Sequence, residues 1–135
     1  MITEDYVSFE IAKLLKEKGF DAECDYLYAD GKLVRAQGYA CNWNDGETLF
    51  ADYKNECSAP TLQMTMKWLR EVHDIGVFPS LFAFCVGEGG AAKPTYGTKI
   101  ISLKSCELLT DDTNPMPTYE QACEAAIKYC LENLI

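Results

Sequence analysis

The strongest hydrophobic pattern in the chain runs from residue 58 to residue 75, SAPTLQMTMKWLREVHDI. Apolar side chains recur there at steps of three and four, which places them on one face of a helix. We predict that Ser58 caps this helix, because a serine hydroxyl accepts a hydrogen bond from a free backbone N–H of the first turn. Gly76 is predicted to end it in the left-handed conformation. The expected buried face comprises Leu62, Met66, Leu69 and either Val72 or His73, and the expected solvent face Gln63, Thr65, Lys67, Arg70, Glu71 and Asp74.

Two further helices are predicted near the ends of the chain. The first covers about residues 4 to 18, with Thr3 as its N-cap and Gly19 as its stop. The last follows Thr118, which has capping-box spacing to Gln121. The expected apolar faces comprise Val7, Ile11, Leu14 and Leu15 in the first helix, and Tyr119, Ala122, Cys123, Ala126, Ile127, Cys130, Leu131 and Leu134 in the last.

Strand patterns follow the central helix. The segment VFPSLFAFCV, residues 77–86, is apolar at both alternating sets of positions. This pattern predicts a strand that is buried on both sides or forms an interface on one. Pro79 places the start of the strand at a sheet edge or a bulge. Residues 87–95 are expected to form a long hairpin tip leading to a second strand, YGTKIISL, and SCELLTDDTNPMP is expected to be a connector.

Residues 20–57 allow two interpretations. Asp30-Gly31 between two apolar runs is a strong two-residue hairpin signal. A second turn signal, at residues 44–46, precedes ETLFADY. The segment is therefore either a three-stranded meander or a long irregular excursion. Taken with the helices, the pattern predicts a single α+β domain over residues 1–135, with about three helices packed on a small antiparallel sheet and a C-terminal α-β-β-α unit from about residue 58.

Charge and hydropathy narrow the function classes. The net charge is −9 and lysines and arginines do not cluster, which disfavours direct nucleic-acid binding. The sequence has no run of eighteen apolar residues, so no membrane span is expected. The N-terminal segment MITEDYVSFE carries acids where a signal peptide carries bases. We therefore expect a cytoplasmic protein.

The seven cysteines, at positions 24, 41, 57, 85, 106, 123 and 130, are odd in number and include no CxxC pair. In a cytoplasmic protein this usage is typical of buried free thiols. Cys24, Cys41 and Cys57 are too widely spaced for a structural zinc site, which uses close ligand pairs. We predict no metal site and no cofactor.

Two other motifs fail on inspection. Asp21, Glu23 and Asp25 begin like a calcium loop, but Tyr26 stands where the loop needs glycine and Lys32 where it needs an acid. The segment GEGGAAKPTYG contains a lysine near glycines, yet proline follows the lysine, and no helix opens there as a P-loop requires.

His73 is the sole histidine of the sequence. It would have to pair with Cys57 or Cys85 in a nucleophilic site, but no cysteine-enzyme signature surrounds either residue. We expect a structural role for His73 and assign no catalytic residue.

The acidic middle section also contains six aromatic side chains, and we expect them to fill a small core rather than to form a protein-binding surface. They are Tyr26, Tyr28, Tyr39, Trp43, Phe50 and Tyr53.

Three stretches of the sequence carry a resemblance to known proteins: EDYVSFEIAKLLKEKGF, SAPTLQMTMKWLREVHDI and PTYEQACEAAIKYCLENLI. Together they cover about half of the chain and resemble a family of small uncharacterised proteins encoded by gut anaerobic bacteria and their prophages or mobile elements. The family has no assigned activity, so the resemblance implies a setting, that of an accessory protein of a mobile element, and transfers no functional residue.

Three function hypotheses follow. The first is a non-enzymatic protein-binding or regulatory accessory protein of a prophage or mobile element, with another protein or a second copy as its partner. The second is an acidic protein that imitates nucleic acid and occupies a host DNA-binding protein. The third is a small enzyme that uses a cysteine and His73.

Overall fold

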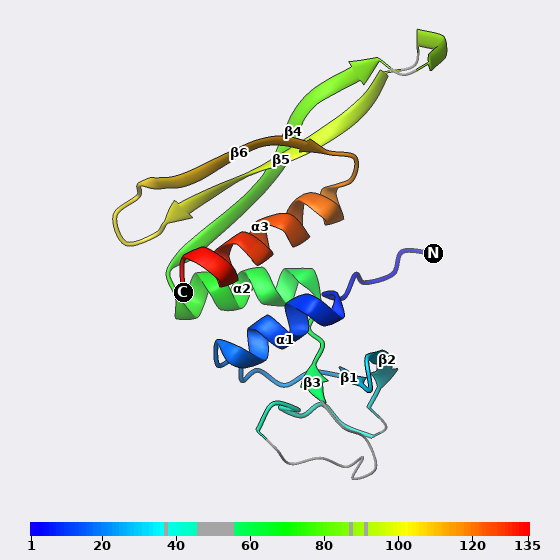
Figure 1. The fold of residues 1–135 in the computed structure, drawn as a ribbon, viewed down its shortest axis with the longest axis vertical. Helices are drawn as coiled ribbons and strands as arrows, with labels where there is room; N and C mark the ends of the chain where they lie inside the picture. The colour runs from blue at the N-terminus through cyan, green and yellow to red at the C-terminus, as the bar shows by residue number, and fades with distance from the viewer. Residues whose placement is uncertain (37, 46–55, 87, 91) are drawn as a thin grey trace. The chain divides into compact units, whose positions relative to one another are not determined.

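The computed structural model describes residues 1–36, 38–45, 56–86, 88–90 and 92–135 (Figure 1). These residues form three α-helices and two antiparallel three-stranded sheets, which confirms the predicted α+β class. The chain folds as two compact units. The first comprises Met1–Met64 together with Ile135, and the second comprises Thr65–Leu134.

In the first unit, helix α1 (Phe9–Glu17) begins later than predicted. Its N-cap is Ser8, whose Oγ accepts a hydrogen bond from the Ile11 N–H at 3.3 Å. The predicted cap, Thr3, is wrong because the chain before Ser8 forms no helix, and Tyr6 instead forms an isolated antiparallel bridge with Thr61. There the Val7 N–H donates to the Pro60 carbonyl at 3.0 Å, so this donor is already satisfied without a helix.

The first sheet has the order β2-β1-β3. The predicted hairpin is confirmed: β1 (Tyr26–Ala29) pairs antiparallel with β2 (Lys32–Arg35) through Asp30 and Gly31, both with positive φ. Strand β3 (Cys57–Ser58) pairs with β1 instead of β2. The described strands therefore do not form a meander, in which each strand would pair with the next along the chain. The meander strand predicted within residues 47–53, and Gly46 of the second turn signal, lie outside the described residues.

Ser58, predicted to cap the central helix, instead belongs to β3 and is fully buried. Its Oγ accepts a hydrogen bond from the Trp43 N–H at 3.0 Å, and its N–H donates to Asn44 Oδ1 at 2.9 Å. Trp43 Nε1 donates in turn to the Cys24 carbonyl. The hydroxyl is thus part of a buried polar network that joins segments distant in sequence, which a local capping rule does not detect.

Helix α2 (Leu62–Val72) begins after Thr61, whose Oγ1 accepts from the Met64 N–H at 3.1 Å. The predicted buried residues Leu62, Met66 and Leu69 are confirmed. The assignment of Thr65 to the solvent face is wrong, because this residue is fully buried. Of the two alternatives for the end of the buried face, Val72 is 57% exposed and His73 is half-buried. Lys67 and Glu71, both expected on the solvent face, form an exposed contact of 3.8 Å.

The predicted stop of this helix at Gly76 is also wrong. Asp74 takes the left-handed conformation, with φ of 55°, and Gly76 already lies in strand β4 (Ile75–Val86). Aspartate tolerates this region better than most residues. The Asp74 carbonyl accepts a hydrogen bond from the Leu103 N–H at 2.7 Å, and this contact between distant segments holds the chain where it leaves the helix.

The second unit contains a sheet of order β4-β5-β6, with β5 at Ala92–Ser102 and β6 at Leu108–Met116 (Figure 1). A short 3₁₀ helix, η1 (Glu88–Gly90), lies at the tip of the β4–β5 hairpin. β4 is an edge strand, as Pro79 predicted. The expected connector is wrong, because most of it forms β6. Its LLTDDTNPM sequence has weak strand propensity, and backbone pairing to β5 supplies the missing stabilisation.

Helix α3 (Tyr119–Asn133) packs on this sheet (Figure 1). Its predicted cap is confirmed, since Thr118 Oγ1 accepts from the Gln121 N–H at 3.1 Å. Val77 of β4 and its partner Ile100 of β5 are buried on one face of the sheet. The helix contributes six buried side chains: Ala122, Cys123, Ala126, Ile127, Cys130 and Leu131.

Candidate functional site

The face of the second sheet opposite the buried pair Val77 and Ile100 carries apolar side chains. Successive residues of a strand point to opposite faces, and directly paired residues point to the same face. The register therefore places two rows of paired residues on this opposite face, Gly76–Ile101–Leu108 and Phe78–Lys99–Asp111. We call these six residues the outer sheet face. Phe78 is 47% exposed and Leu108 is 55% exposed.

Exposed apolar residues continue along the edge strand β4. Leu81 is 52% exposed and Phe82 is 46% exposed. The pairing register shifts between Leu81 and Ala83, so Phe82 occupies a bulge without a paired residue on β5. The predicted burial of this strand on both sides is therefore wrong for residues 78–82, whereas the interface alternative agrees with their exposure. An exposed apolar edge strand is typical of a surface that binds another chain.

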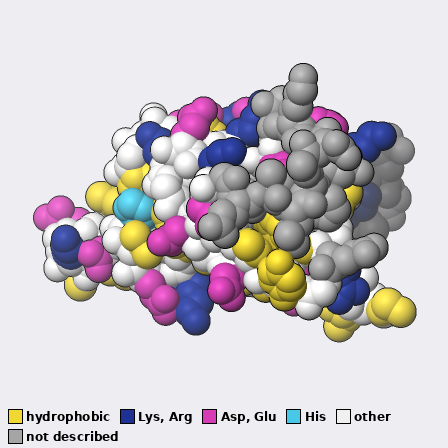
Figure 2. Space-filling view, turned by 90° about the horizontal axis from the view of Figure 1, so that it is seen from below, with side chains coloured by type: hydrophobic (Ala, Val, Ile, Leu, Met, Phe, Trp, Pro, Cys, Tyr) yellow, Lys and Arg dark blue, Asp and Glu magenta, His cyan; other side chains and the backbone are white. Residues whose placement is uncertain are grey.

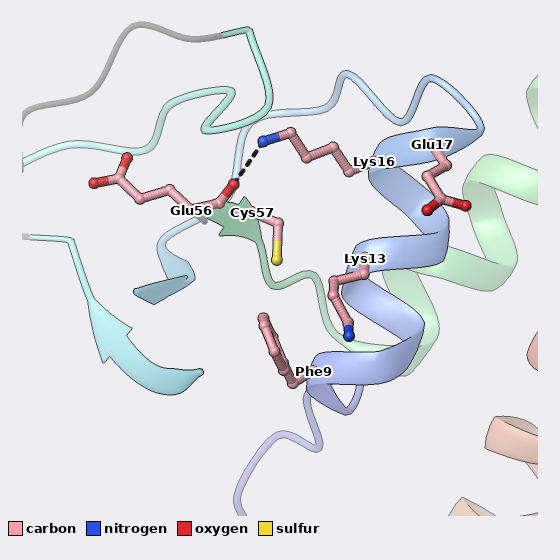
Figure 3. A pocket seen from close by; sticks show the side chains of 6 residues that line it. All are labelled: Phe9, Lys13, Lys16, Glu17, Glu56 and Cys57. Atoms are coloured by element: carbon pink, nitrogen blue, oxygen red, sulfur yellow. Dashed lines mark hydrogen bonds between the residues drawn. The ribbon is translucent and has the colours of Figure 1, made fainter. Parts of the chain in front are cut away.

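A cavity of about 630 Å³ lies in the first unit beside α1 and β3 (Figure 3). Lys13 Nζ lies 4.7 Å from the centre of the Phe9 ring, and Lys16 Nζ donates to the Glu56 backbone carbonyl at 2.8 Å. Among the described residues its lining consists of Phe9, Lys13, Lys16, Glu17, Glu56 and Cys57. The sequence patterns did not reveal this site, because its residues come from segments about forty positions apart.

The thiol of Cys57 is buried beside this cavity. Burial raises its pKa from 9.0 to about 11, while the positive charges of Lys16 and Lys13 act in the opposite direction with smaller effect. The thiol is therefore neutral at physiological pH. A neutral thiol is a poor nucleophile and behaves as a small apolar group, so Cys57 gives the cavity an apolar surface and no activated sulfur.

The first unit contains Cys24, Cys41 and Cys57, whose wide spacing in the sequence argued against a zinc site. Cys24 and Cys41 form an isolated antiparallel bridge through their backbones, and Cys57 lies on β3. Burial raises the pKa of Cys24 to about 12, which opposes the thiolate form that metals bind. Within the described part of the chain, no three His, Cys, Asp or Glu residues are grouped as a metal site would require.

His73 follows α2 and contacts Trp68 edge-on, with ring centres 4.6 Å apart. Its Nε2 is buried and has no hydrogen-bond partner among the described residues. A nucleophilic pair with His73 would need Cys57 or Cys85. Cys57 belongs to the other unit, and the side chain of Cys85 lies outside the described residues. The described surroundings of the imidazole thus contain an aromatic ring and no identified catalytic partner.

The aromatic residues of the middle section divide into two groups. Trp43 is buried, and the Tyr28 hydroxyl donates to the Val7 carbonyl at 2.7 Å, as expected for aromatic residues of a core. Tyr26 packs against Tyr6 with ring centres 4.3 Å apart. Tyr39, in contrast, is 59% exposed. Phe50 and Tyr53 lie outside the described residues.

The rejected calcium and phosphate motifs have other structural roles. The acids Asp21, Glu23 and Asp25 are exposed, and the chain continues directly into β1 at Tyr26. Lys93 lies on β5, within the β4–β5 hairpin. On the face shown in Figure 2, acidic side chains are interspersed with lysines, arginines and apolar side chains.

In the part of the chain that the structure describes, no helix combines the length and apolar character needed to cross a membrane. Comparison with protein-family models, with curated proteins and with solved structures finds no match to the chain. The candidate sites are therefore the outer sheet face with the β4 edge, and the cavity beside α1.

Proposed function

We propose that this protein is a non-enzymatic accessory protein that binds another protein through the outer sheet face and the adjoining edge of β4. The single observation that carries the proposal is the exposure of Phe78 and Leu108 on the outer sheet face and of Phe82 at the bulge of the adjoining edge strand. Scattered apolar side chains are ordinary on protein surfaces, but several exposed apolar side chains on the two outer strands of one sheet are typical of an interaction site.

The edge of β4 supports the same proposal. An edge strand presents backbone N–H and C=O groups to which an extended segment of a partner can pair. Pro79 removes one donor from this edge, and the bulge at Phe82 interrupts its regular pairing. Such features limit indiscriminate strand addition. We therefore expect a contact made mainly by apolar side chains, with few backbone hydrogen bonds.

Charge favours a different protein over a second copy as the partner. The chain carries a net charge of −9, so two copies repel each other, whereas a basic protein is attracted. The outer sheet face itself offers one cation and one anion side by side, Lys99 and Asp111. The proposed partner is thus a basic protein that has an apolar contact surface. Its origin in a mobile element or its host rests on the resemblance described above.

The nucleic-acid mimic hypothesis requires acids arranged in a row along one surface. On the face that Figure 2 shows, the described acids are interspersed with lysines and arginines and form no such row there. The enzyme hypothesis requires a thiol activated by His73, and the apolar contact of that imidazole with Trp68 counts against it.

The test is affinity capture from the proposed host with the intact chain and two double variants. Phe82→Ser with Leu108→Ser removes two apolar side chains from the sheet. Leu33→Ser with Val72→Ser is the matched control, because both positions are exposed, at 42% and 57%, and lie outside that sheet. The proposal expects one basic protein captured by the intact chain and the control, lost with the sheet variant, and able to form a complex from purified components.

Solution mass measurements complete the test. Light scattering over a range of concentrations should give a monomer for the purified chain. Equal capture by all three proteins would contradict the assigned surface. A dimer dissociated by the sheet variant would replace the basic partner with a second copy, and an intact chain that binds nothing would contradict the function.

A further inference from the structure

We infer that the cavity beside α1 binds a small organic carboxylate with an apolar or aromatic body. This inference concerns the first unit and is independent of the protein-binding proposal, which concerns the sheet of the second. The cavity volume, about 630 Å³, lies within the range of about 300–1,000 Å³ that is usual for small-molecule sites.

The wall of the cavity suits an apolar body. The Phe9 ring forms one side, and the neutral thiol of Cys57 contributes a small apolar surface. Figure 3 shows both side chains on the same side of α1 as the ammonium group of Lys13. A flat or branched apolar group placed there would contact the aromatic ring and the sulfur, and its transfer from water would be favourable.

Two ammonium groups suit a carboxylate. Lys13 Nζ is held over the Phe9 ring, and Lys16 Nζ is held by the Glu56 carbonyl. A lysine has three N–H donors, and the bond to Glu56 uses one of those on Lys16. The two lysines are three residues apart on α1 and therefore lie on neighbouring turns of one helix face. Both contribute to the lining of the cavity.

The carboxylates of the lining disfavour a ligand with more than one negative charge. The lining residues Lys13 and Lys16 are balanced formally by Glu17 and Glu56. In Figure 3 the Glu56 side chain extends away from Lys13 and from the thiol. Because the two glutamates offset the two lysines, the lining carries no net positive charge, and it opposes a doubly charged phosphate more than a single carboxylate placed beside the ammonium groups. The neutral thiol forms no covalent bond with the ligand, so binding is reversible.

The test is an NMR titration of the intact chain with phenylacetate, with phenylacetamide as the neutral isostere and inorganic phosphate as the divalent competitor. Saturable shifts are expected at the backbone amides of Lys16 and Cys57. Phenylacetamide and phosphate are each expected to bind at least about tenfold more weakly than phenylacetate. Phenylacetamide lacks the negative charge, and phosphate lacks the apolar body.

Variants locate the binding site. Lys13→Met with Lys16→Met keeps the apolar stems and removes both charges, and it should weaken phenylacetate binding at least about tenfold. Lys104→Met is the control. Lys104 is exposed, and both Lys104 and its partner Asp74 belong to the second unit, whereas the cavity lies in the first. It should leave the affinity unchanged. Absence of a saturable shift up to about 20 mM phenylacetate, a concentration that would reveal even millimolar affinity, would overturn the inference.

Two further outcomes would also overturn it. Equal binding of phenylacetamide would remove the role of the carboxylate, and tighter binding of phosphate would remove the role of the apolar wall. These comparisons use the unaltered chain, so they decide the inference even where the double variant fails to fold.

Discussion

The ring of Phe78 covers the bare backbone of Gly76, two residues earlier on the same edge strand. A Cβ atom placed on Gly76 would lie 2.6 Å from Phe78 Cε2 and 3.0 Å from Leu103 Cδ2. Glycine weakens a strand because it has no side chain to pack, and an aromatic neighbour compensates by covering the gap. Part of the exposed Phe78 ring therefore has a structural role in the sheet.

This relationship predicts energetic coupling between the two positions. Gly76→Ala should displace the Phe78 ring, whereas the same substitution in a Phe78→Ala background meets no ring. We expect the change in unfolding free energy caused by Gly76→Ala to be more favourable in the second background by about 0.5–1 kcal/mol. Urea unfolding of the four proteins of this cycle measures the difference. Identical effects in both backgrounds would show that the ring does not restrict the site.

Asp74 provides a second test at the end of α2. Its φ of 55° favours glycine, so Asp74→Gly should maintain or raise the unfolding free energy, by up to about 1 kcal/mol. Asp74→Val should lower the unfolding free energy by more than about 1 kcal/mol, because a β-branched residue is strained at this backbone conformation. Thermal or urea unfolding distinguishes the two variants. The exposed contact with Lys104, 3.5 Å long, contributes little to either result.

Asn44 connects two segments of the first unit. Its Oδ1 accepts from the Ser58 N–H and its Nδ2 donates to the Phe20 carbonyl, both at 2.9 Å. Asn44→Ala removes both bonds and should lower the unfolding free energy by about 2–3 kcal/mol. Trp43, its buried neighbour, is a fluorescence probe for the transition. Asn133→Ala, which removes an exposed bond to Tyr129, is the control and should change stability by less than about 0.5 kcal/mol.

The buried thiols predict a loss of stability at alkaline pH. Burial raises the pKa of Cys57 and Cys123 to about 11 and that of Cys24 and Cys130 to about 12, from an ordinary value of 9.0. The folded chain keeps protons that the unfolded chain releases. Stability from these groups is therefore complete below pH 9 and is lost as the pH rises towards 11 and 12.

The measurement is urea unfolding at a series of pH values from 7 upward. Between the unfolded and folded pKa values, each thiol should contribute a slope of about −1.4 kcal/mol per pH unit. Cys130→Ala should reduce the slope by the contribution of one thiol, while lowering stability at neutral pH through the lost packing. A slope unchanged by this substitution would contradict the assignment to Cys130.

Local chemistry explains what the sequence predicted correctly. The Asp30-Gly31 turn, the Thr118 cap, the edge position of Pro79 and the buried stripe of α3 each depend on residues within a few positions of one another. Backbone conformational preference and helical periodicity act over that range. These rules therefore identified the α+β class and the three helices without coordinates, although the start of α1 was misplaced because the Val7 N–H bonds to Pro60.

The candidate sites required the fold. The cavity joins α1 to residues about forty positions away, and the outer sheet face exists because β6 pairs with β5 despite its weakly strand-forming sequence. Ser58 shows the same limit, because its hydroxyl bonds to Trp43 rather than to a helix N–H.

The amino-acid order alone determined where helices and the tight turn form, since these depend on short-range hydrogen bonds and side-chain spacing. Only the tertiary structure decided which polar groups meet, which apolar residues stay exposed and where a cavity opens. The physical reason is that burial and long-range pairing depend on neighbours far away in the chain, and these neighbours also decide whether an apolar strand becomes part of a core or a surface.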